Sequence, residues 1–221
     1  DVKLEPSRSD FRVVINRDDV KVDEISISTA SPGRHNVENA LAAIAVGSEL
    51  MVPHAYLSAA LKTFSGADRR LQVCGDVNGI VVIDDYAHHP TEIEAVLETV
   101  RLRAPRRLRV VFQPHRYSRT RRLLDRFGEV LAKADEVILT EVYAANESPL
   151  SGATSVDVAQ AVTKHGNVPV RLAKTLDEAV EIVTRDVRPG DVVVTLGAGS
   201  IGTLPSRITE VLHTRCVGSS V

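Results

Sequence analysis

Residues 80–93 read I-V-V-I-D-D-Y-A-H-H-P-T-E-I, and this stretch decides the fold. Its first four residues are apolar and β-branched, which predicts a strand buried on both faces. Pro90 fits the first turn of a following helix, where Glu92 and Glu94 lie near the positive end of the helix dipole. Ligands of open α/β sheets bind at the carboxyl ends of strands, so the polar residues between strand and helix form the candidate site.

The order of strand, then helix, continues along the rest of the chain. We expect further strands at 108–112, 136–140, 168–172 and 191–196, and helices at 91–102, 121–134, 155–164, 176–183 and 201–212. This alternation is typical of parallel βαβ units. The predicted fold class is therefore α/β, with a doubly wound, mostly parallel, six-stranded sheet of the Rossmann-like kind.

The composition is that of a globular protein with a sizeable core, because 43% of the 221 residues are hydrophobic and 25% are charged;. A formal net charge of −2 gives no reason to expect nucleic acid or an anionic membrane as a partner;. No apolar run approaches the roughly 20 residues that span a bilayer, and no signal peptide is visible, so we expect a cytoplasmic protein. Cys74 and Cys216 are expected to be free thiols.

The first third of the chain is expected to belong to a different domain. Strands are predicted at 11–15 and 25–29, and two short strands cannot form an independently stable unit. We therefore expect residues 1–65 to be the tail of a larger upstream domain. Residues 66–214 would form the α/β domain, and 215–221 a loose tail.

Two groups of polar residues precede the organising strand. His35, Asn36 and Asn39 lie at the front of a helix predicted over 31–47, where backbone N–H groups lack partners; the simple interpretation makes Asn36 the N-cap and His35 a surface residue;. Arg70 comes shortly before the strand and is a candidate contact for phosphate or ribose. The alternative for Arg70 is a solvated surface arginine.

The strand at 108–112 ends in Q-P-H-R-Y-S-R-T, residues 113–120. His115, Arg116 and Arg119 follow its carboxyl end, so they are expected near Asp85, Tyr86 and His88. Two arginines in that place indicate an anionic substrate group, whereas the alternative is a pair of exposed loop arginines.

The last predicted strand runs into T-L-G-A-G-S-I-G, in which Gly197, Gly199 and Gly202 match the G-x-G-x-x-G pattern;. A dinucleotide site would require a following βα unit with an acidic residue, and only one helix remains. We therefore expect a tight turn, or a loop whose backbone lines the candidate site.

A divalent-metal cluster of Asp84, Asp85, His88 and His89 is a further alternative, because carboxylate and imidazole suit several metal ions. Neighbouring side chains of an extended segment point to opposite sides, however, so the four cannot all converge.

Taken together, six segments resemble the Mur ligase family, in order and over nearly the whole chain. They are G-R-H-N-V-E-N-A-L-A-A (33–43), R-R-L-Q (69–72), D-D-Y-A-H-H-P-T-E (84–92), F-Q-P-H-R-Y-S-R-T (112–120), V-Y-A-A-N-E (142–147) and T-L-G-A-G-S-I-G (195–202). Members of this family have three domains, for UDP-sugar, ATP and amino acid. The resemblance implies that residues 1–65 end the central ATP-binding domain and that 66–214 form the amino-acid-binding ligase domain.

The resemblance also implies the chemistry and the partners. They are UDP-N-acetylmuramate, L-alanine and ATP, joined through an acyl phosphate in peptidoglycan precursor synthesis. The H-R-Y-S-R segment favours a single amino acid over a whole peptide as the group added. By the same resemblance His35, Asn36 and Asn39 would contact adenine, and Arg70 and Asp85 the phosphates and ribose. The amino-acid pocket and its carboxylates would be lined by Tyr86, His88, Arg116 and Arg119, and the residues assigned to catalysis are Asp85, His88 and Arg116.

Three departures from the family pattern matter. Ala87 and Asn146 stand where the family usually has glycine, and either would be tolerated unless the backbone requires a conformation that it cannot adopt. The chain contains no G-x-x-G-K-[ST] phosphate loop, and the Mg²⁺ ligands are expected in the missing upstream part;. We therefore expect this chain alone to be inactive. The alternatives to a ligase function are a metal-dependent hydrolase and a non-catalytic nucleotide-binding module.

Overall fold

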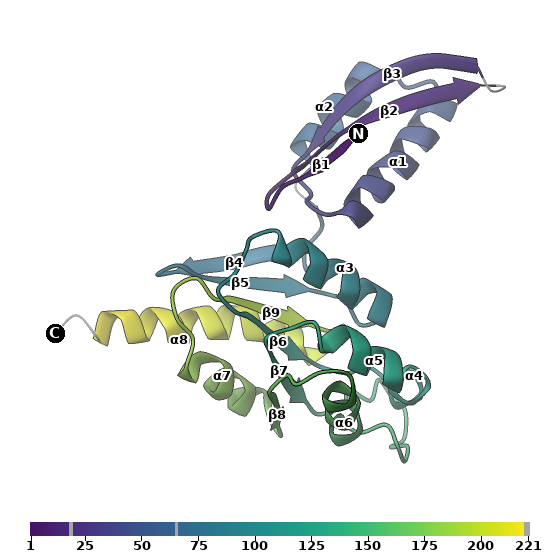
Figure 1. Ribbon diagram of the computed structural model, residues 1–221. Coiled ribbons are helices and arrows are strands. Elements are labelled where there is room, and N and C mark those ends of the chain that lie inside the picture. Colours follow the sequence, from purple (N-terminus) through teal and green to yellow (C-terminus); the bar gives the residue numbers. More distant parts are fainter. Residues whose placement is uncertain (18–19, 65, 219–221) are drawn as a thin grey trace. The chain divides into compact units, whose positions relative to one another are not determined.

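The computed structural model describes residues 1–17, 20–64 and 66–218 (Figure 1). The chain divides into two compact units. Unit 1 comprises Asp1–Ala67 and Glu98–Arg103, and unit 2 comprises Asp68–Leu97 and Ala104–Val221. Within the described ranges, every helix is too short or too polar to span a lipid bilayer.

Unit 1 is a three-stranded antiparallel sheet with two helices. The elements are β1 (Val2–Leu4), β2 (Ser9–Arg17), β3 (Val20–Thr29), α1 (Arg34–Glu49) and α2 (His54–Thr63), and the strand order is β1-β2-β3. Its core is made by Phe11, Ile27, Val37, Ala40 and Ile44. Both strands expected here are present, whereas β1 was not predicted, because three residues are too few to show a periodic pattern;.

A polar chain joins the two helices of unit 1 to its sheet. His54 is the first residue of α2, and its Nδ1 contacts the carboxylate of Asp23 in β3. Its other ring nitrogen lies 3.4 Å from the hydroxyl of Ser48, near the end of α1. The bond from His54 lowers the pKa of Asp23. One histidine thus links α1, α2 and β3.

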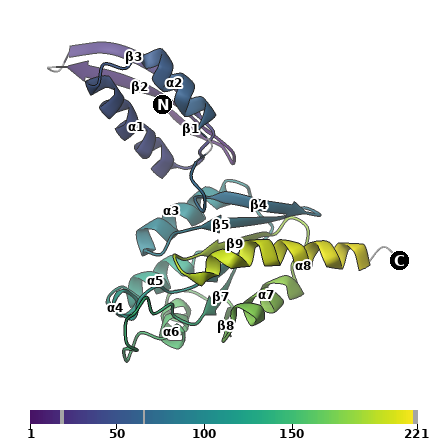
Figure 2. The same ribbon diagram turned by 180° about the vertical axis from the view of Figure 1, so that it is seen from behind.

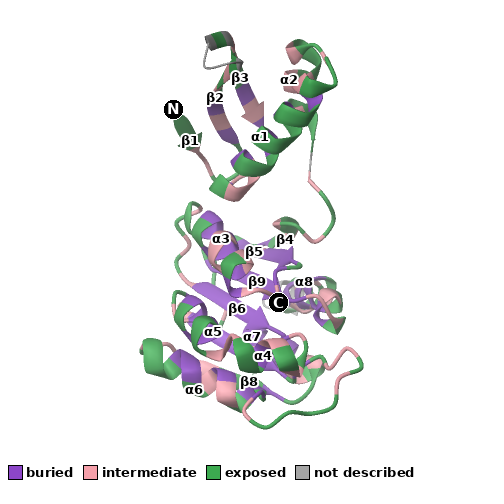
Figure 3. Cartoon of the chain, turned by 90° about the vertical axis from the view of Figure 1, so that its right-hand side faces the viewer, coloured by how far each residue is buried: buried purple, intermediate pink, exposed green. Residues whose placement is uncertain are grey.

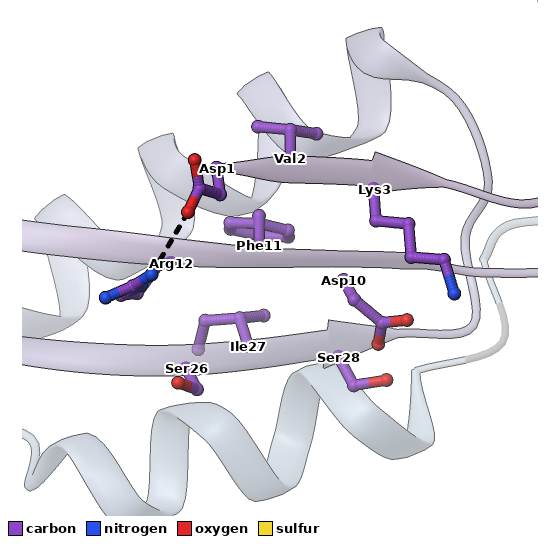
Figure 4. Close-up of a pocket in the computed structure, with 9 residues that line it drawn as sticks. All are labelled: Asp1, Val2, Lys3, Asp10, Phe11, Arg12, Ser26, Ile27 and Ser28. Atoms are coloured by element: carbon purple, nitrogen blue, oxygen red, sulfur yellow. Dashed lines mark hydrogen bonds and ion pairs between the residues drawn. The ribbon is translucent and has the colours of Figure 1, made fainter.

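A hollow of about 430 Å³ lies over the sheet of unit 1 (Figure 4). Apolar Phe11 and Ile27 lie there among charged side chains, and Arg12 Nη2 is 3.1 Å from Asp1 Oδ2. The nine lining residues are Asp1, Val2, Lys3, Asp10, Phe11, Arg12, Ser26, Ile27 and Ser28. None of these nine is a predicted site residue.

Unit 2 is built on the predicted six-stranded sheet, in the order β4-β5-β9-β6-β7-β8. The strands are β4 (Gln72–Val77), β5 (Ile80–Asp85), β6 (Leu108–Phe112), β7 (Glu136–Thr140), β8 (Val170–Ala173) and β9 (Val192–Leu196). All neighbouring pairs are parallel except β4 with β5. β6, β7 and β9 are buried along their whole length (β6 and β9 are labelled in Figure 3), so most of their residues are apolar, and the exceptions include Arg109 in β6 and Glu136 in β7;.

Helices cover both faces of this sheet (Figures 1 and 2). One face carries α3 (Pro90–Arg101), α5 (Leu124–Leu131) and α6 (Ser155–His165), and the other carries α7 (Leu176–Arg185) and α8 (Leu204–Gly218). The contact between α5 and α6 is close, since a Cβ on Gly128 would lie 2.5 Å from the carbonyl oxygen of Ala161. The prediction of a doubly wound α/β sheet is confirmed.

Two predicted helices of unit 2 differ from the structure. The helix expected at 121–134 is divided into α4 (Tyr117–Arg122) and α5, because Leu123 leaves the helical region at φ −111° and ψ 17°. The break lets α5 bury Phe127 against Phe112, with ring centres 5.4 Å apart, while arginine-rich α4 stays at the surface. At the other end, α8 includes residues 215–218, which we expected in a loose tail, because no helix-breaking residue occurs before Gly218;. Residues 219–221 lie outside the described part.

Candidate functional site

The carboxyl end of β5 presents Asp85, which is 3% exposed. Each of its oxygens accepts a backbone hydrogen bond, from Leu71 N at 2.8 Å and from Ala87 N at 2.7 Å. Burial raises the pKa of Asp85, although these two bonds and the nearby Arg70 act in the opposite direction. Asp85 therefore fastens the segment that precedes β4 to the loop that follows β5.

Replacing Asp85 by Asn should lower the free energy of unfolding of unit 2 by about 1–3 kcal/mol. An amide has only one acceptor oxygen, so one of the two backbone N–H groups would face an NH₂ group. The measurement is chemical denaturation of the chain. Asp76→Asn is the matched control, because Asp76 accepts one bond from Gly79 N in an exposed turn, which an amide oxygen can also accept;. Equal effects of the two substitutions would contradict the prediction.

The neighbouring Asp84 is held by Arg69, a residue that the sequence analysis did not single out. Arg69 Nε lies 2.7 Å from Asp84 Oδ2, and Thr195 Oγ1 donates to Asp84 Oδ1 at 2.6 Å. Arg69 also donates to the carbonyl of Gly197 at 2.6 Å. A Cβ on Gly202 would come within 2.7 Å of the guanidinium carbon of Arg69. Arg69 thus ties β5 to the loop after β9.

Arg70 lies near the same aromatic ring as Arg69. Its guanidinium carbon lies 6.0 Å from the ring centre of Tyr86, and the corresponding distance for Arg69 is 5.1 Å. Tyr86 is 39% exposed, so both arginines are near a ring that a ligand can reach;.

His88 is positioned by two backbone contacts. Its Nδ1 lies 2.9 Å from the carbonyl oxygen of Tyr86, and its backbone N–H donates to Glu92 Oε2 at 3.0 Å. His89 N also donates to Glu92 Oε2, at 3.1 Å. Burial alone would raise the pKa of Glu92, but these bonds and the charge of His88 bring it below the ordinary value. A carbonyl can only accept, so His88 Nδ1 is the donor of this contact, and Nε2 is the ring nitrogen that can accept when it carries no proton.

The turn after β6 carries the two predicted arginines. Arg116 has the left-handed φ of 71° and precedes α4, and its N–H donates to the carbonyl of Tyr143 at 2.8 Å. Tyr143 N donates in turn to the carbonyl of Pro114 at 2.8 Å. Arg119 points back along the turn, with Nη1 3.3 Å from His115 Nδ1. The segment after β7 therefore holds the turn after β6.

Four rings lie in a row across the carboxyl ends of β5, β6 and β7. The ring centres of Tyr86 and His88 are 5.5 Å apart, those of His88 and His115 are 5.6 Å apart, and those of His115 and Tyr143 are 5.4 Å apart. The last pair is stacked, with 16° between the planes. Burial, His88 and Arg119 lower the pKa of His115. The structure thus brings Tyr86 and His88 after β5 together with His115 after β6, and adds Tyr143.

The glycine loop after β9 supports this row. A Cβ on Gly199 would lie 2.6 Å from the ring of Tyr143 and 2.6 Å from Gln113 Oε1. The same Gln113 oxygen accepts from Ile201 N at 3.1 Å. These contacts fit the expectation of a tight loop beside the candidate site.

At Ala87 and Asn146, where the family usually has glycine, the backbone has a conformation that the residue present can adopt. Ala87 is not among the described residues with positive φ, so an alanine is unstrained there. Asn146 has φ 69°, and asparagine tolerates the left-handed region better than most residues;.

In unit 1, the prediction that Asn36 is the N-cap of α1 is wrong. The N-cap is Gly33, at φ 98°, and Asn36 lies in the first turn, where its Nδ2 donates to the carbonyl of Pro32 at 2.8 Å. Asn39 Nδ2 lies 3.3 Å from Asn36 Oδ1. The G-R-H-N order favoured asparagine as a cap, but the positive φ selects glycine at that position.

The metal-cluster alternative finds no support in the geometry. In the ranges 1–17, 20–64 and 66–218, no three His, Cys, Asp or Glu side chains converge as metal ligands. Asp84 and Asp85 are instead engaged by Arg69 and by backbone N–H groups.

Comparison with known proteins decides the family. The family described as "Mur ligase, glutamate ligase domain" matches residues 69–199, which is more than half of the chain. The chain belongs to the Mur ligase family. The matched range begins at Arg69 and ends at Gly199, so it contains all of the unit 2 contacts described above except those of Ile201 and Gly202.

Curated Mur ligases match both units. The UDP-N-acetylmuramate–L-alanine ligase of Solibacter usitatus is 42% identical over 218 residues, which are 99% of this chain and 45% of that protein. The enzyme of the same name from Halorhodospira halophila is 49% identical over 188 residues, 83% of this chain and 39% of that protein. The chain thus spans less than half the length of these relatives.

Solved structures of Mur ligases are similar to this chain in fold as well. The UDP-N-acetylmuramate–alanine ligase of Thermotoga maritima superposes with a TM-score of 0.79 at 27% identity, over 97% of this chain and 45% of that one. A murein peptide ligase of Psychrobacter arcticus gives 0.66 at 26% identity, over 96% of this chain and 43% of that one.

Proposed function

We propose that this chain is part of an ATP-dependent ligase that joins L-alanine to UDP-N-acetylmuramate in peptidoglycan precursor synthesis, in the cytoplasm. The observation that carries the proposal is the match of 99% of the chain, at 42% identity, to a protein named for that reaction. Two features at one edge of the sheet support the proposal: the ring row (Tyr86, His88, His115 and Tyr143) and the arginine turn, which follows β6 and carries Arg116 and Arg119.

Unit 1 carries the residues that we assign to adenine. His35, Asn36 and Asn39 lie in the first turns of α1, and the two carboxamides offer both donors and acceptors, as an adenine edge requires;. In unit 2 we assign Arg70 to the phosphates and Asp85 to the ribose. Because both Asp85 oxygens already accept backbone bonds, any ribose hydroxyl would use a second lone pair of the same oxygens;.

ATP supplies the phosphoryl group that activates the muramate carboxylate, and we place the Mg²⁺ ligands outside this chain. The residues of the chain then act on the amino acid. Arg116 and Arg119 would hold the L-alanine carboxylate, and Tyr86 would pack against the substrate. His88 Nε2, the acceptor nitrogen, would take the proton from the alanine ammonium, which makes the amine a nucleophile. Attack on the acyl phosphate gives a tetrahedral intermediate that loses phosphate; holding the reactants in place lowers the barrier.

The test uses the full-length enzyme that contains this chain, supplied with ATP, Mg²⁺ and UDP-N-acetylmuramate. We expect L-alanine to be ligated in preference to a tripeptide. Preference for the peptide would favour the function in the name of the Psychrobacter arcticus structure, a murein peptide ligase. Absence of both reactions would overturn the proposal.

The isolated chain of residues 1–221 should fold but show no ATP-dependent ligation. Its sequence contains no Gly-Lys pair, and therefore no phosphate loop of the G-x-x-G-K-[ST] kind;. The measurement is phosphate release in the presence of all three substrates, with circular dichroism as the check of folding. Turnover by the pure chain would show that the phosphoryl-transfer machinery lies within these residues.

A further inference from the structure

We infer that Glu147 is a positioning residue for the arginine turn, and that it sets the affinity for the amino-acid carboxylate. The inference rests on the proposed function and deepens it. Glu147 follows β7 in the V-Y-A-A-N-E segment, and the roles assigned above do not include it.

The Glu147 carboxylate holds the start of α4 with both oxygens. Ser118 N donates to Oε2 at 2.9 Å, and Ser118 Oγ donates to Oε1 at 2.6 Å. These two bonds and the charge of Arg116 lower the pKa of Glu147, so it is ionised at neutral pH. The interaction is thus charge-assisted, and it joins the start of α4 to a loop that is distant from it in sequence;.

The backbone of the arginine turn requires stabilisation by residues outside the turn. Arg116 is the residue before α4, and it offers no side-chain cap to the first N–H groups of the helix. Its φ of 71° is unfavourable for a residue with a Cβ;. Glu147 supplies the missing cap, so it stabilises the backbone that carries both Arg116 and Arg119.

The segment that presents Glu147 is itself fixed. Ala145 and Asn146 both have left-handed φ values, 48° and 69°, and Glu147 N donates to the carbonyl of Ala144 at 3.0 Å, which closes a tight turn. At its start, Tyr143 exchanges backbone bonds with Pro114 and Arg116. This segment therefore holds the arginine turn at two points, through the backbone of Tyr143 and through the side chain of Glu147.

A general helix-capping role would give the same contacts, so a matched control is needed. Asp157 provides it, because its carboxylate accepts from Thr154 N at 2.7 Å and from Thr154 Oγ1 at 2.6 Å at the start of α6. Asp157→Ala removes the same kind of capping interaction from a helix that carries none of the assigned site residues.

The experiment measures steady-state kinetics of the full-length enzyme with each variant. Glu147→Ala should raise KM for L-alanine about five- to tenfold, leave KM for ATP within about twofold, and change kcat less than KM, because the affected arginines hold the alanine carboxylate. Glu147→Gln, which keeps one acceptor oxygen, should recover part of the change. Asp157→Ala should lower Tm about as much as Glu147→Ala does, but it should leave KM for L-alanine unchanged.

Four results would overturn the inference or its basis. An unchanged KM for L-alanine in Glu147→Ala, or an equal rise in Asp157→Ala, overturns the positioning role. Absence of L-alanine ligation by the unaltered enzyme overturns the proposed function, and this inference with it. If Glu147→Ala does not fold, Ser118→Ala is used instead, because it removes only the hydroxyl bond. This variant should raise KM for L-alanine about twofold. An unchanged KM would overturn the positioning role.

Discussion

Replacing Arg109 by Met should lower the free energy of unfolding of unit 2 by about 3–5 kcal/mol. Arg109, at the start of β6, is 1% exposed, and its guanidinium lies 3.3 Å from Glu136 and 3.5 Å from Asp191. Both carboxylates are almost fully buried as well. Replacing Arg109 removes the fully buried partner of both carboxylates, which keep only the partly exposed Arg171 and Arg106. Methionine cannot donate to them in this medium of low dielectric constant.

The same guanidinium also satisfies two backbone carbonyls, those of Val183 at 3.2 Å and Asp186 at 2.8 Å. Chemical denaturation of the chain measures the effect. Arg126→Met is the control, because Arg126 is half-exposed and pairs with Glu129 at the surface, where an ion pair contributes at most about 1 kcal/mol;. A loss below about 1 kcal/mol for Arg109→Met would show that the buried network is not stabilising.

In the full-length enzyme, Arg116→Ala and Arg119→Ala should each lower kcat/KM about 10- to 150-fold. This range corresponds to the loss of one charge-assisted hydrogen bond to a carboxylate, about 1.5–3 kcal/mol. Tm should change little, because Arg116 is exposed and Arg119 is only partly buried.

Arg121 and Arg122 on the same short helix are the controls for this prediction. They carry the same charge and are exposed, so their substitution by Ala tests a general effect of positive charge on an anionic substrate;. We expect less than threefold change for either. Equal losses at all four arginines would point to a general effect of positive charge rather than to two specific contacts.

The fold was predictable because its strands are buried on both faces. The apolar runs of β5, β6, β7 and β9 each identified a strand, and Pro90 marked the helix after β5;. The break at Leu123 was not predictable, because both α4 and α5 lie within one helical pattern and the bend depends on where Phe127 finds its core contact.

The candidate site was predictable in its position but not in its supports. Polar residues after β5 and β6 pointed to one edge of the sheet, and His88 and His115 do lie together there. The roles of Arg69 and Glu147 depend on contacts with residues distant in sequence, Gly197 and Ser118, which no local pattern reveals. The one sequence feature that could have indicated a role for Arg69 was the R-R pair upstream of Asp84 and Asp85. The left-handed φ of Arg116 was equally invisible, since arginine is not a residue that favours it.

The position of β9 has a consequence for how the protein is made. β9 is the last of the six strands of this sheet to be synthesised, and it lies between β5 and β6, where Val193 pairs with Val82 on one side and Val194 with Val110 on the other. Until it arrives, two hydrophobic strand edges have no partner, and the edge that carries Tyr86 and His88 is not joined to the edge that carries His115. A nascent chain therefore cannot present a complete ring row, and the unpaired edges are exposed to wrong partners during synthesis.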